Sequence, residues 1–197
     1  MLIVITNPVI FTDEANIINT LFEEGLQLLH MRKPGIGIYH LKYLLGLIHE
    51  EYYDRLVLHQ HYNLAGQYGI NRIHFTESNR PDFDKILEML GNDQEWIFST
   101  STHSLEDFNG LSHRYEYAFL SPVYNSISKP GYAPDTDIIE SIKRRSNFNT
   151  KLIALGGISH KNYKQTLQTG FDGVAVLGNI WNSGDPICEF KTFNNEK

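Results

Sequence analysis

The chain of 197 residues has little cysteine and no long run of hydrophobic residues. Cys188 is its only cysteine, so it cannot form an internal disulfide framework. No apolar run reaches the roughly 18 residues that a membrane-spanning helix needs. The apolar N-terminal run breaks at Asn7 and Pro8 and has no basic segment before it, which favours a first core strand over a signal peptide. We therefore expect a cytoplasmic protein with no membrane partner.

An excess of positive charge is also missing, because the formal net charge is -6 at pH 7. Nucleic acids and anionic membranes attract proteins through clustered positive charge, so neither is expected as a partner. A small phosphorylated ligand needs only a few local cations and remains possible. The chain is 41% hydrophobic, enough to fill one core, and we expect a single domain over residues 1–197.

Short apolar runs alternate with amphipathic segments along the chain. The alternation in units of roughly 25 residues predicts parallel strands joined by helical crossovers. Eight units predict an α/β fold, a single (β/α)8 TIM barrel with a short C-terminal helix. An open doubly wound sheet is the alternative, but the glycine-rich turn usual after its first strand is missing. The predicted strands are 2–6, 26–32, 55–60, 72–75, 96–101, 117–122, 151–157 and 171–178, and the main predicted helices are 13–25, 38–52, 62–69, 81–91, 104–111, 134–145 and 159–170.

Active sites of such barrels lie at the C-terminal ends of the strands. Two glycine-containing turns follow the seventh and eighth strands, where backbone N–H groups commonly bind phosphate. Arg32 and Lys129 can supply positive charge there, although an ion pair for Arg32 and solvent exposure for Lys129 are the structural alternatives. The candidate residues at this rim are His30, Arg32, Lys33, His59, Gln60, Ser101, His103, Ser126, Ser128, Lys129, Gly156, Gly157, Leu177 and Gly178.

Several histidines follow the predicted strands. His59, His61, His74 and His103 show no helical spacing of a zinc motif, and no cysteine or carboxylate joins them at the strand ends. We expect these imidazoles on the surface or at the mouth of the barrel rather than in a metal site.

An ordered set of motifs resembles the thiamine phosphate synthase/TenI family over nearly the whole chain: LLHMRKP, LVLHQHYNLA, GINRIHF, STSTHSLED, YAFLSPVYNSISK, KLIALGGIS and FDGVAVLGNIW. The resemblance implies a (β/α)8 barrel that joins hydroxymethylpyrimidine diphosphate to thiazole phosphate and releases pyrophosphate with the help of Mg²⁺. It also implies roles for the matching residues. Ser126, Ser128, Gly157, Leu177 and Gly178 would bind the thiazole phosphate, Lys129 and Arg32 the diphosphate, and Ser101 would lie near the pyrimidine.

The chain departs from the synthase motifs where the metal ligands are expected. His59 and Gln60 stand where the family has Asn-Asp, Asn79 stands in place of a second Asp, and His30 in place of Gln. Glu77 and Asn79 are therefore the candidate metal residues. Lys33 is a candidate for the family's lysine, whose aligned position holds proline here.

These departures leave two alternatives to the synthase reaction. One is a TenI-type thiazole tautomerase, in which His103 or His30 would carry the proton because Pro122 occupies the position of that branch's histidine. The other is a non-catalytic binder of a phosphorylated thiamine intermediate. Aromatic residues such as Tyr52 and Tyr53, expected to be exposed, are compatible with a homodimer.

Overall fold

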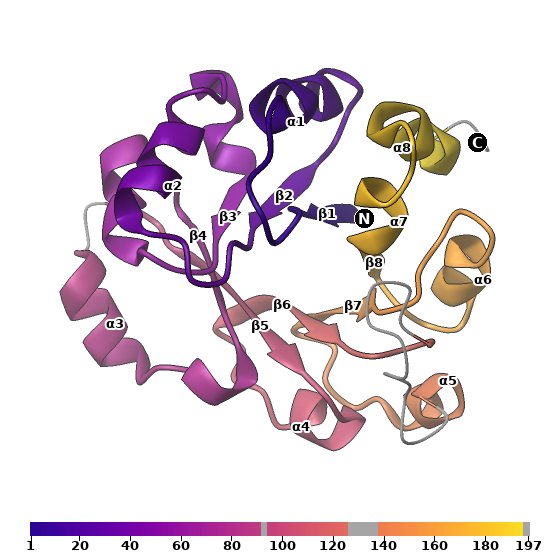
Figure 1. The fold of residues 1–197 in the computed structure, drawn as a ribbon. Coiled ribbons are helices and arrows are strands. Elements are labelled where there is room, and N and C mark those ends of the chain that lie inside the picture. Colours follow the sequence, from indigo (N-terminus) through magenta and orange to yellow (C-terminus); the bar gives the residue numbers. More distant parts are fainter. Residues whose placement is uncertain (92–93, 126–137, 195–197) are drawn as a thin grey trace.

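The structure, a computed structural model, describes residues 1–91, 94–125 and 138–194 (Figure 1). Eight parallel strands form a closed barrel in the order of the sequence, and β8 pairs with β1. The (β/α)8 barrel predicted from the sequence is therefore confirmed, and an open sheet is excluded. The strands are β1 (Leu2–Ile5), β2 (Leu28–Met31), β3 (Leu56–Leu58), β4 (Arg72–Phe75), β5 (Ile97–Thr102), β6 (Tyr115–Leu120), β7 (Lys151–Leu155) and β8 (Gly173–Val176).

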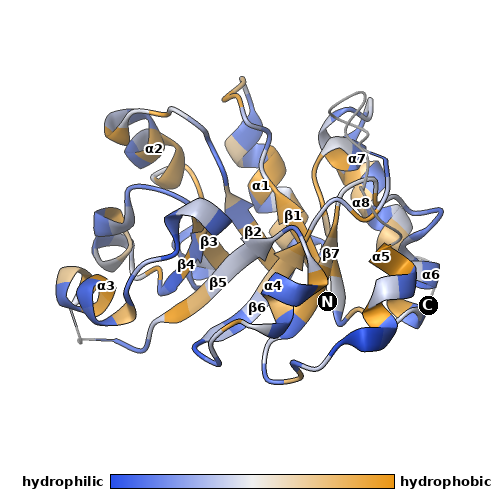
Figure 2. Ribbon diagram, turned by 90° about the horizontal axis from the view of Figure 1, so that it is seen from below, coloured by the Kyte–Doolittle hydropathy of each residue, from blue (hydrophilic) through white to orange (hydrophobic). Residues whose placement is uncertain are grey.

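Helices surround the barrel, and Figure 2 shows that they carry both hydrophilic and hydrophobic residues, as expected of elements that face the sheet on one side and solvent on the other. The short C-terminal helix is confirmed as α8, of nine residues. Within the described ranges no helix is both long and apolar enough to cross a membrane. The α-helices are α1 (Glu14–Glu23), α2 (Ile38–Leu45), α3 (Phe83–Leu90), α4 (Leu105–Asn109), α5 (Ile138–Ser141), α6 (Tyr163–Gln168), α7 (Gly178–Trp181) and α8 (Pro186–Asn194), and 3-10 turns cover Glu50–Arg55, Tyr62–Leu64, Gly66–Tyr68, Glu77–Asn79 and Ile142–Arg144.

The helix predicted over 38–52 is shorter than expected. It ends at Leu45, and a 3-10 turn follows over Glu50–Arg55. The Asn19 side chain from α1 fixes this break, because its amide donates to the Leu47 carbonyl at 3.1 Å and accepts from the His49 N–H at 3.0 Å. The segment predicted as a helix over 62–69 likewise forms two 3-10 turns.

The hydrophobic core has two parts. The larger one lies between the strands and the surrounding helices. The smaller one fills the interior of the barrel, so the barrel is packed rather than open. Its buried members are Ile3, Ile5, Leu28, Val57, Tyr117, Phe119, Ile153 and Ala175.

The aromatic residues suggested for a homodimer surface are not freely exposed. Tyr52 is 8% exposed and packs on Phe22, with ring centroids 4.8 Å apart. Tyr53 is half-buried and donates its hydroxyl to the Leu45 carbonyl at 3.0 Å. The homodimer stays a prediction without support from these two residues.

Lys33 belongs to a buried ion pair rather than to the rim. Its ammonium group contacts the Glu14 carboxylate, and both side chains are 1% exposed. The ammonium also donates to the carbonyls of Asn7 at 2.6 Å and Val9 at 3.2 Å, so it ties the loop after β1 to α1. Burial lowers the pKa of Lys33 and raises that of Glu14, while the pairing opposes both shifts. The expectation that Lys33 binds substrate is therefore wrong, because the ammonium group is enclosed by protein.

Replacement of Lys33 by methionine is expected to destabilise the fold, because it leaves the Glu14 carboxylate buried without its cation. Breaking a buried pair in this way costs about 3–5 kcal/mol. Urea denaturation would measure the loss, and Glu14→Leu combined with Lys33→Met should recover part of it. Lys143→Met is the matched control, since Lys143 is 73% exposed in its pair with Glu140. A Lys33→Met variant as stable as the parent would contradict the assignment.

Candidate active site

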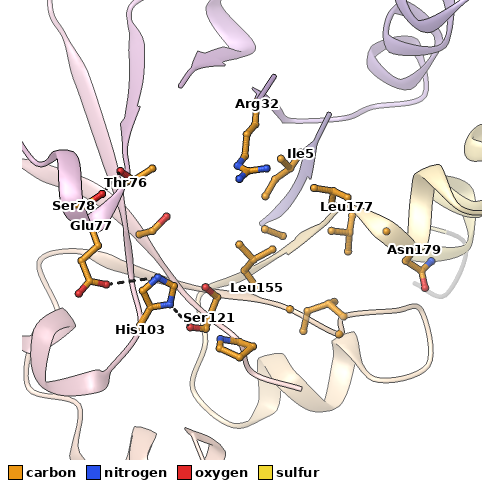
Figure 3. A pocket seen from close by; sticks show the side chains of 18 residues that line it. Ile5, Arg32, Thr76, Glu77, Ser78, His103, Ser121, Leu155, Leu177 and Asn179 are labelled. Atoms are coloured by element: carbon orange, nitrogen blue, oxygen red, sulfur yellow. Dashed lines mark hydrogen bonds and ion pairs between the residues drawn. The ribbon is translucent and has the colours of Figure 1, made fainter. Parts of the chain in front are cut away.

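A cavity of about 800 Å³ opens at the C-terminal ends of the strands (Figure 3). Residues at or after the ends of β1, β2, β4, β5, β6, β7 and β8 line it. This is the end of the barrel at which the sequence analysis places the site. Of the predicted rim residues, the lining includes Arg32, Ser101, His103, Gly156, Gly157, Leu177 and Gly178, together with the candidate metal residue Glu77.

Arg32 extends into the cavity from the end of β2 (Figure 3). Its backbone is held by Thr6, whose hydroxyl lies 3.0 Å from the Arg32 N–H and 3.1 Å from the Arg32 carbonyl. No carboxylate within the described part of the chain forms an ion pair with its guanidinium group. A planar guanidinium without a protein partner is suited to bind a carboxylate or phosphate on two oxygens.

His103 and Glu77 face each other across one side of the cavity (Figure 3). The His103 Nδ1 donates to the Ser121 carbonyl at 2.8 Å, and its Nε2 lies 3.8 Å from a Glu77 carboxylate oxygen. The contact to Ser121 fixes the orientation of the ring and leaves Nε2 free to exchange a proton with a ligand. An imidazole held in this way can act as a general acid or base.

Arg80 braces this side of the cavity, although the sequence analysis did not identify it. Its guanidinium group binds both Asp107 oxygens at 2.7 and 2.6 Å and also donates to the Ser101 carbonyl at 2.6 Å. These bonds tie the turn that carries Glu77 to β5 and α4. The sequence gives little sign of this role, because Arg80 and Asp107 are separated by 27 residues.

The Gly156–Gly157 turn needs glycine for its backbone conformation and its packing. Both residues have positive φ angles, of 99° and 67°. A Cβ atom on Gly156 would lie 2.9 Å from the Pro122 Cα, which is too close. The Tyr124 N–H donates to the Gly156 carbonyl at 3.1 Å and fixes the turn against the end of β6. Glycine is therefore required for this tight turn, and the turn lines the cavity with its backbone.

The second turn lies on the neighbouring strand. Gly178 and Asn179 follow β8 and begin α7, and both line the cavity. The first N–H groups of a helix have no helical carbonyl partner. Turns from β7 and β8 therefore stand side by side at the mouth, as the sequence analysis expects of a phosphate site.

Other candidate residues lie elsewhere. Gln60 donates its side-chain amide to the Lys33 carbonyl, so it braces the loop after β2 rather than lining the cavity. Asn79 ends the 3-10 turn after β4 and is not among the lining residues. Ser126, Ser128 and Lys129 lie outside the described residues. The sequence analysis missed the lining residues Ile5, Thr76 and Ser78, although each lies in or just after a predicted strand.

Three histidines meet inside the barrel. His30 Nδ1 lies 2.9 Å from His59 Nε2, and the rings of His59 and His74 stack with their centroids 4.3 Å apart. The expectation that His74 is a surface or mouth-lining residue is wrong, because it is 1% exposed, and His59 is half-buried. His30 is 0% exposed and does not line the cavity. His61 also has an internal role, since its Nε2 donates to the Ile36 carbonyl at 2.7 Å.

Burial keeps these three imidazoles neutral. It lowers the pKa of His30 and His59 well below the usual range, and it lowers the pKa of His74 to about 3. Nearby positive charge adds to the shift: Arg72 acts on His30, and Arg32 acts on His59 and His74. The neutral form is the one that binds metals, and it has one donor nitrogen and one acceptor nitrogen.

The described groups at this mouth offer few ligands for a magnesium ion. Mg²⁺ binds oxygen ligands, usually carboxylates and phosphates, in octahedral geometry. Of the carboxylates in the described ranges, only Glu77 lines the cavity, and it is next to His103. The positions at which the synthase motifs carry other oxygen ligands hold His59, Gln60 and Asn79 here.

The fold and the cavity define a (β/α)8 barrel with an anion-suited mouth at the C-terminal ends of its strands. A family model described as thiamine monophosphate synthase matches residues 2–180, and the chain belongs to this family. The thiamine-phosphate synthase of Clostridium acetobutylicum is 26% identical over 164 residues, which cover 79% of this chain and 74% of that protein.

Solved structures agree with this assignment. A thiamine phosphate pyrophosphorylase from Bacteroides thetaiotaomicron has a TM-score of 0.78 and 33% identity, and the match covers 98% of this chain and 95% of that one. A 3-hexulose-6-phosphate synthase has a TM-score of 0.70 at 12% identity, covering 99% of each chain, and shares the fold alone.

Replacement of Arg32 by glutamine is expected to weaken the binding of inorganic pyrophosphate by about 10- to 100-fold, the value of a hydrogen-bonded charge contact. Isothermal titration calorimetry would measure the affinity. Arg114→Gln is the control, because Arg114 is exposed and contacts Asp84 away from the cavity. Equal affinities for the Arg32 variant and the parent would remove Arg32 from anion binding.

Proposed function

We propose that the protein is a thiamine-phosphate synthase that joins hydroxymethylpyrimidine diphosphate to thiazole phosphate and releases pyrophosphate. Family membership and the structural match to a thiamine phosphate pyrophosphorylase support this proposal. The observation that carries it is the cavity itself, into which the unpaired Arg32 and the turns after β7 and β8 all converge. A cavity of about 800 Å³ is of the size that small-molecule sites have.

The reaction needs two things from the protein. Loss of pyrophosphate from the methylene carbon of the pyrimidine leaves a carbocation-like centre that the aminopyrimidine ring stabilises, and the thiazole nitrogen then bonds to this carbon. The protein must hold the two substrates in contact and neutralise the departing charge. Positioning and electrostatic stabilisation are therefore the tasks to assign.

The rim residues divide these tasks between them. In this proposal the backbone of Gly157, Leu177 and Gly178 binds the thiazole phosphate, since small residues and helix N–H groups allow close approach of an anion. Arg32 binds the diphosphate from β2. Ser101, whose hydroxyl lies 2.9 Å from His74 Nε2, faces the pyrimidine from the floor of the cavity.

The loop after β6 completes the proposed site. Ser126 and Ser128 are assigned to the thiazole phosphate and its surroundings, and Lys129 to the diphosphate. No step of the proposal passes through a magnesium ion, because the described residues at the mouth supply too few oxygen ligands. Neutralisation of the leaving group is therefore assigned to Arg32 and Lys129.

A thiazole tautomerase is the second candidate, and the geometry of His103 favours it. Its Nδ1 is fixed by the Ser121 carbonyl, and Nε2 lies at the cavity beside Glu77. A ring in this state can take a proton from a carbon acid and return it to another position. Tautomerisation requires no leaving group and no metal, which suits a mouth poor in carboxylates.

Incubation of the protein with both substrates tests the first proposal, and formation of thiamine phosphate with equimolar pyrophosphate is expected. Lys129→Ala should lower turnover by roughly 100-fold, because a charge that stabilises the transition state is lost. The thermal midpoint should stay unchanged. Lys143→Ala serves as the control lysine, since Lys143 lies on the surface. If the Lys129 variant turns over at the parent's rate, Lys129 has no part in the mechanism, and if the parent makes no product the synthase proposal fails.

His103→Asn distinguishes the tautomerase. If the protein isomerises thiazole carboxylate phosphate, this variant should lose roughly 100-fold or more in rate, because an amide cannot carry the proton. Nuclear magnetic resonance of the thiazole would follow the isomerisation, with His113→Asn as the control at an exposed histidine. Tight binding of thiazole phosphate by a parent that performs neither reaction would identify a non-catalytic binder.

A further inference from the structure

Three neighbouring strands bring one imidazole each to the same point inside the barrel. His30 lies on β2, His59 directly follows β3, and His74 lies on β4. One ring nitrogen from each histidine lies within 4.8 Å of the other two. We propose that His30, His59 and His74 form a binding site for a divalent transition-metal ion such as Zn²⁺ at the floor of the cavity.

The spacing of the nitrogens suits such an ion. In a tetrahedral zinc site with Zn–N bonds of about 2.0–2.1 Å, the nitrogens lie about 3.3–3.4 Å apart. Here the His30 Nδ1 and His59 Nε2 atoms are 2.9 Å apart, and the largest separation in the cluster is at most 4.8 Å. The required distance lies between these values, and the stacked rings of His59 and His74 would rotate to direct their nitrogens at one ion.

Hydrogen bonds on the outer side of the rings prepare them as ligands. The Ser99 hydroxyl donates to the Ile73 carbonyl at 3.3 Å and so accepts from His74 Nδ1 at 2.9 Å. This assignment leaves the lone pair of His74 on Nε2, on the side of Ser101. His30 Nε2 lies 2.7 Å from the Tyr117 hydroxyl and can donate to it, which leaves the Nδ1 lone pair facing His59 Nε2, and an ion would take the place of that hydrogen bond. Metal-binding histidines commonly donate their other N–H in this way.

The cavity supplies a fourth position. Ser101 lines the cavity and contacts His74, so the cluster lies directly under the cavity floor. Of the three histidines, His59 is half-buried and the other two are buried. Three histidines with one open position are an arrangement found in catalytic zinc sites, where water or a ligand oxygen completes the tetrahedron.

The donor set selects the type of ion. Neutral imidazoles suit Zn²⁺, Co²⁺, Ni²⁺ and Cu²⁺, whereas Mg²⁺ requires oxygen ligands. Two positive side chains lie near the cluster. Arg72 is neutralised by Glu116 at 3.0 Å, and Arg32 faces the cavity, where an anionic ligand can offset both its charge and that of the ion.

The test is a titration of chelator-treated protein with Co²⁺, followed by visible absorption, and with Zn²⁺, followed by calorimetry. One ion per chain is expected, with the strong ligand-field bands of tetrahedral Co²⁺, displacement by Zn²⁺ and no displacement by Mg²⁺. Zn²⁺ should also raise the thermal midpoint, because it binds the folded state. These measurements need no turnover, so they stand or fall separately from the proposed reaction.

Two variants place the binding at the cluster. His59→Asn and His30→Gln introduce the residue types of the synthase motifs at these positions, so the barrel is expected to fold with either one. Each should weaken Co²⁺ binding by more than roughly 100-fold, beyond the effect of losing an outer hydrogen-bond partner. His113→Asn on the exposed surface should bind as the parent does.

Two results would overturn the proposal. The first is a parent that binds no Co²⁺ at one ion per chain, which would make the histidines a hydrogen-bonded polar layer of the core. The second is a folded His59→Asn or His30→Gln variant that keeps the parent's affinity and absorption bands.

Discussion

The parallel pairing of β8 with β1 sets Leu2 opposite Val174 and Val4 opposite Val176, and this closure arranges the rest of the molecule. In a closed parallel barrel all strands end on the same rim, so residues far apart in the sequence meet around one mouth. Inside the barrel, side chains from neighbouring strands converge on a common axis. Groups that can bind anions lie at the rim, and the inward-facing side chains of all strands lie together in the interior.

In this geometry the neighbouring residues Arg32 and Lys33 have very different surroundings. Both are basic, yet Arg32 reaches the cavity and Lys33 is enclosed beside Glu14. An enclosed charge needs a partner within the protein, whereas a charge at a cavity can be left for a ligand. Glu14 is the partner of Lys33 and Asp107 is the partner of Arg80, whereas no carboxylate in the described ranges pairs with Arg32.

The sequence was sufficient for the fold and for most of the rim. Eight apolar runs separated by helical patterns predict the barrel. Because the active sites of such barrels lie at the C-terminal ends of the strands, the sequence also places Arg32, His103 and Gly157 at the mouth. The partner of Lys33 was not predicted, because Glu14 lies 19 residues away in a different element. The early end of α2 depends on Asn19, and the histidine cluster depends on three strands. Both features join residues that are distant in the sequence, so neither could be recognised from a short motif.

The residues at the rim of the cavity match the synthase motifs more closely than the residues at its floor do. The turns after β7 and β8 and the arginine at the end of β2 are retained, and backbone N–H groups and fixed charge of this kind can bind anions. The ends of β3 and β4, where the motifs place oxygen ligands, instead provide His59 and a turn with Glu77 as its carboxylate at the cavity. Of the positions that carry oxygen ligands in the motifs, one holds the imidazole of His59 here, and the two aspartate positions hold the amides Gln60 and Asn79. Because Arg32 and the turns after β7 and β8 lie on strands other than β3 and β4, the proposed phosphate site does not depend on the groups at the ends of β3 and β4.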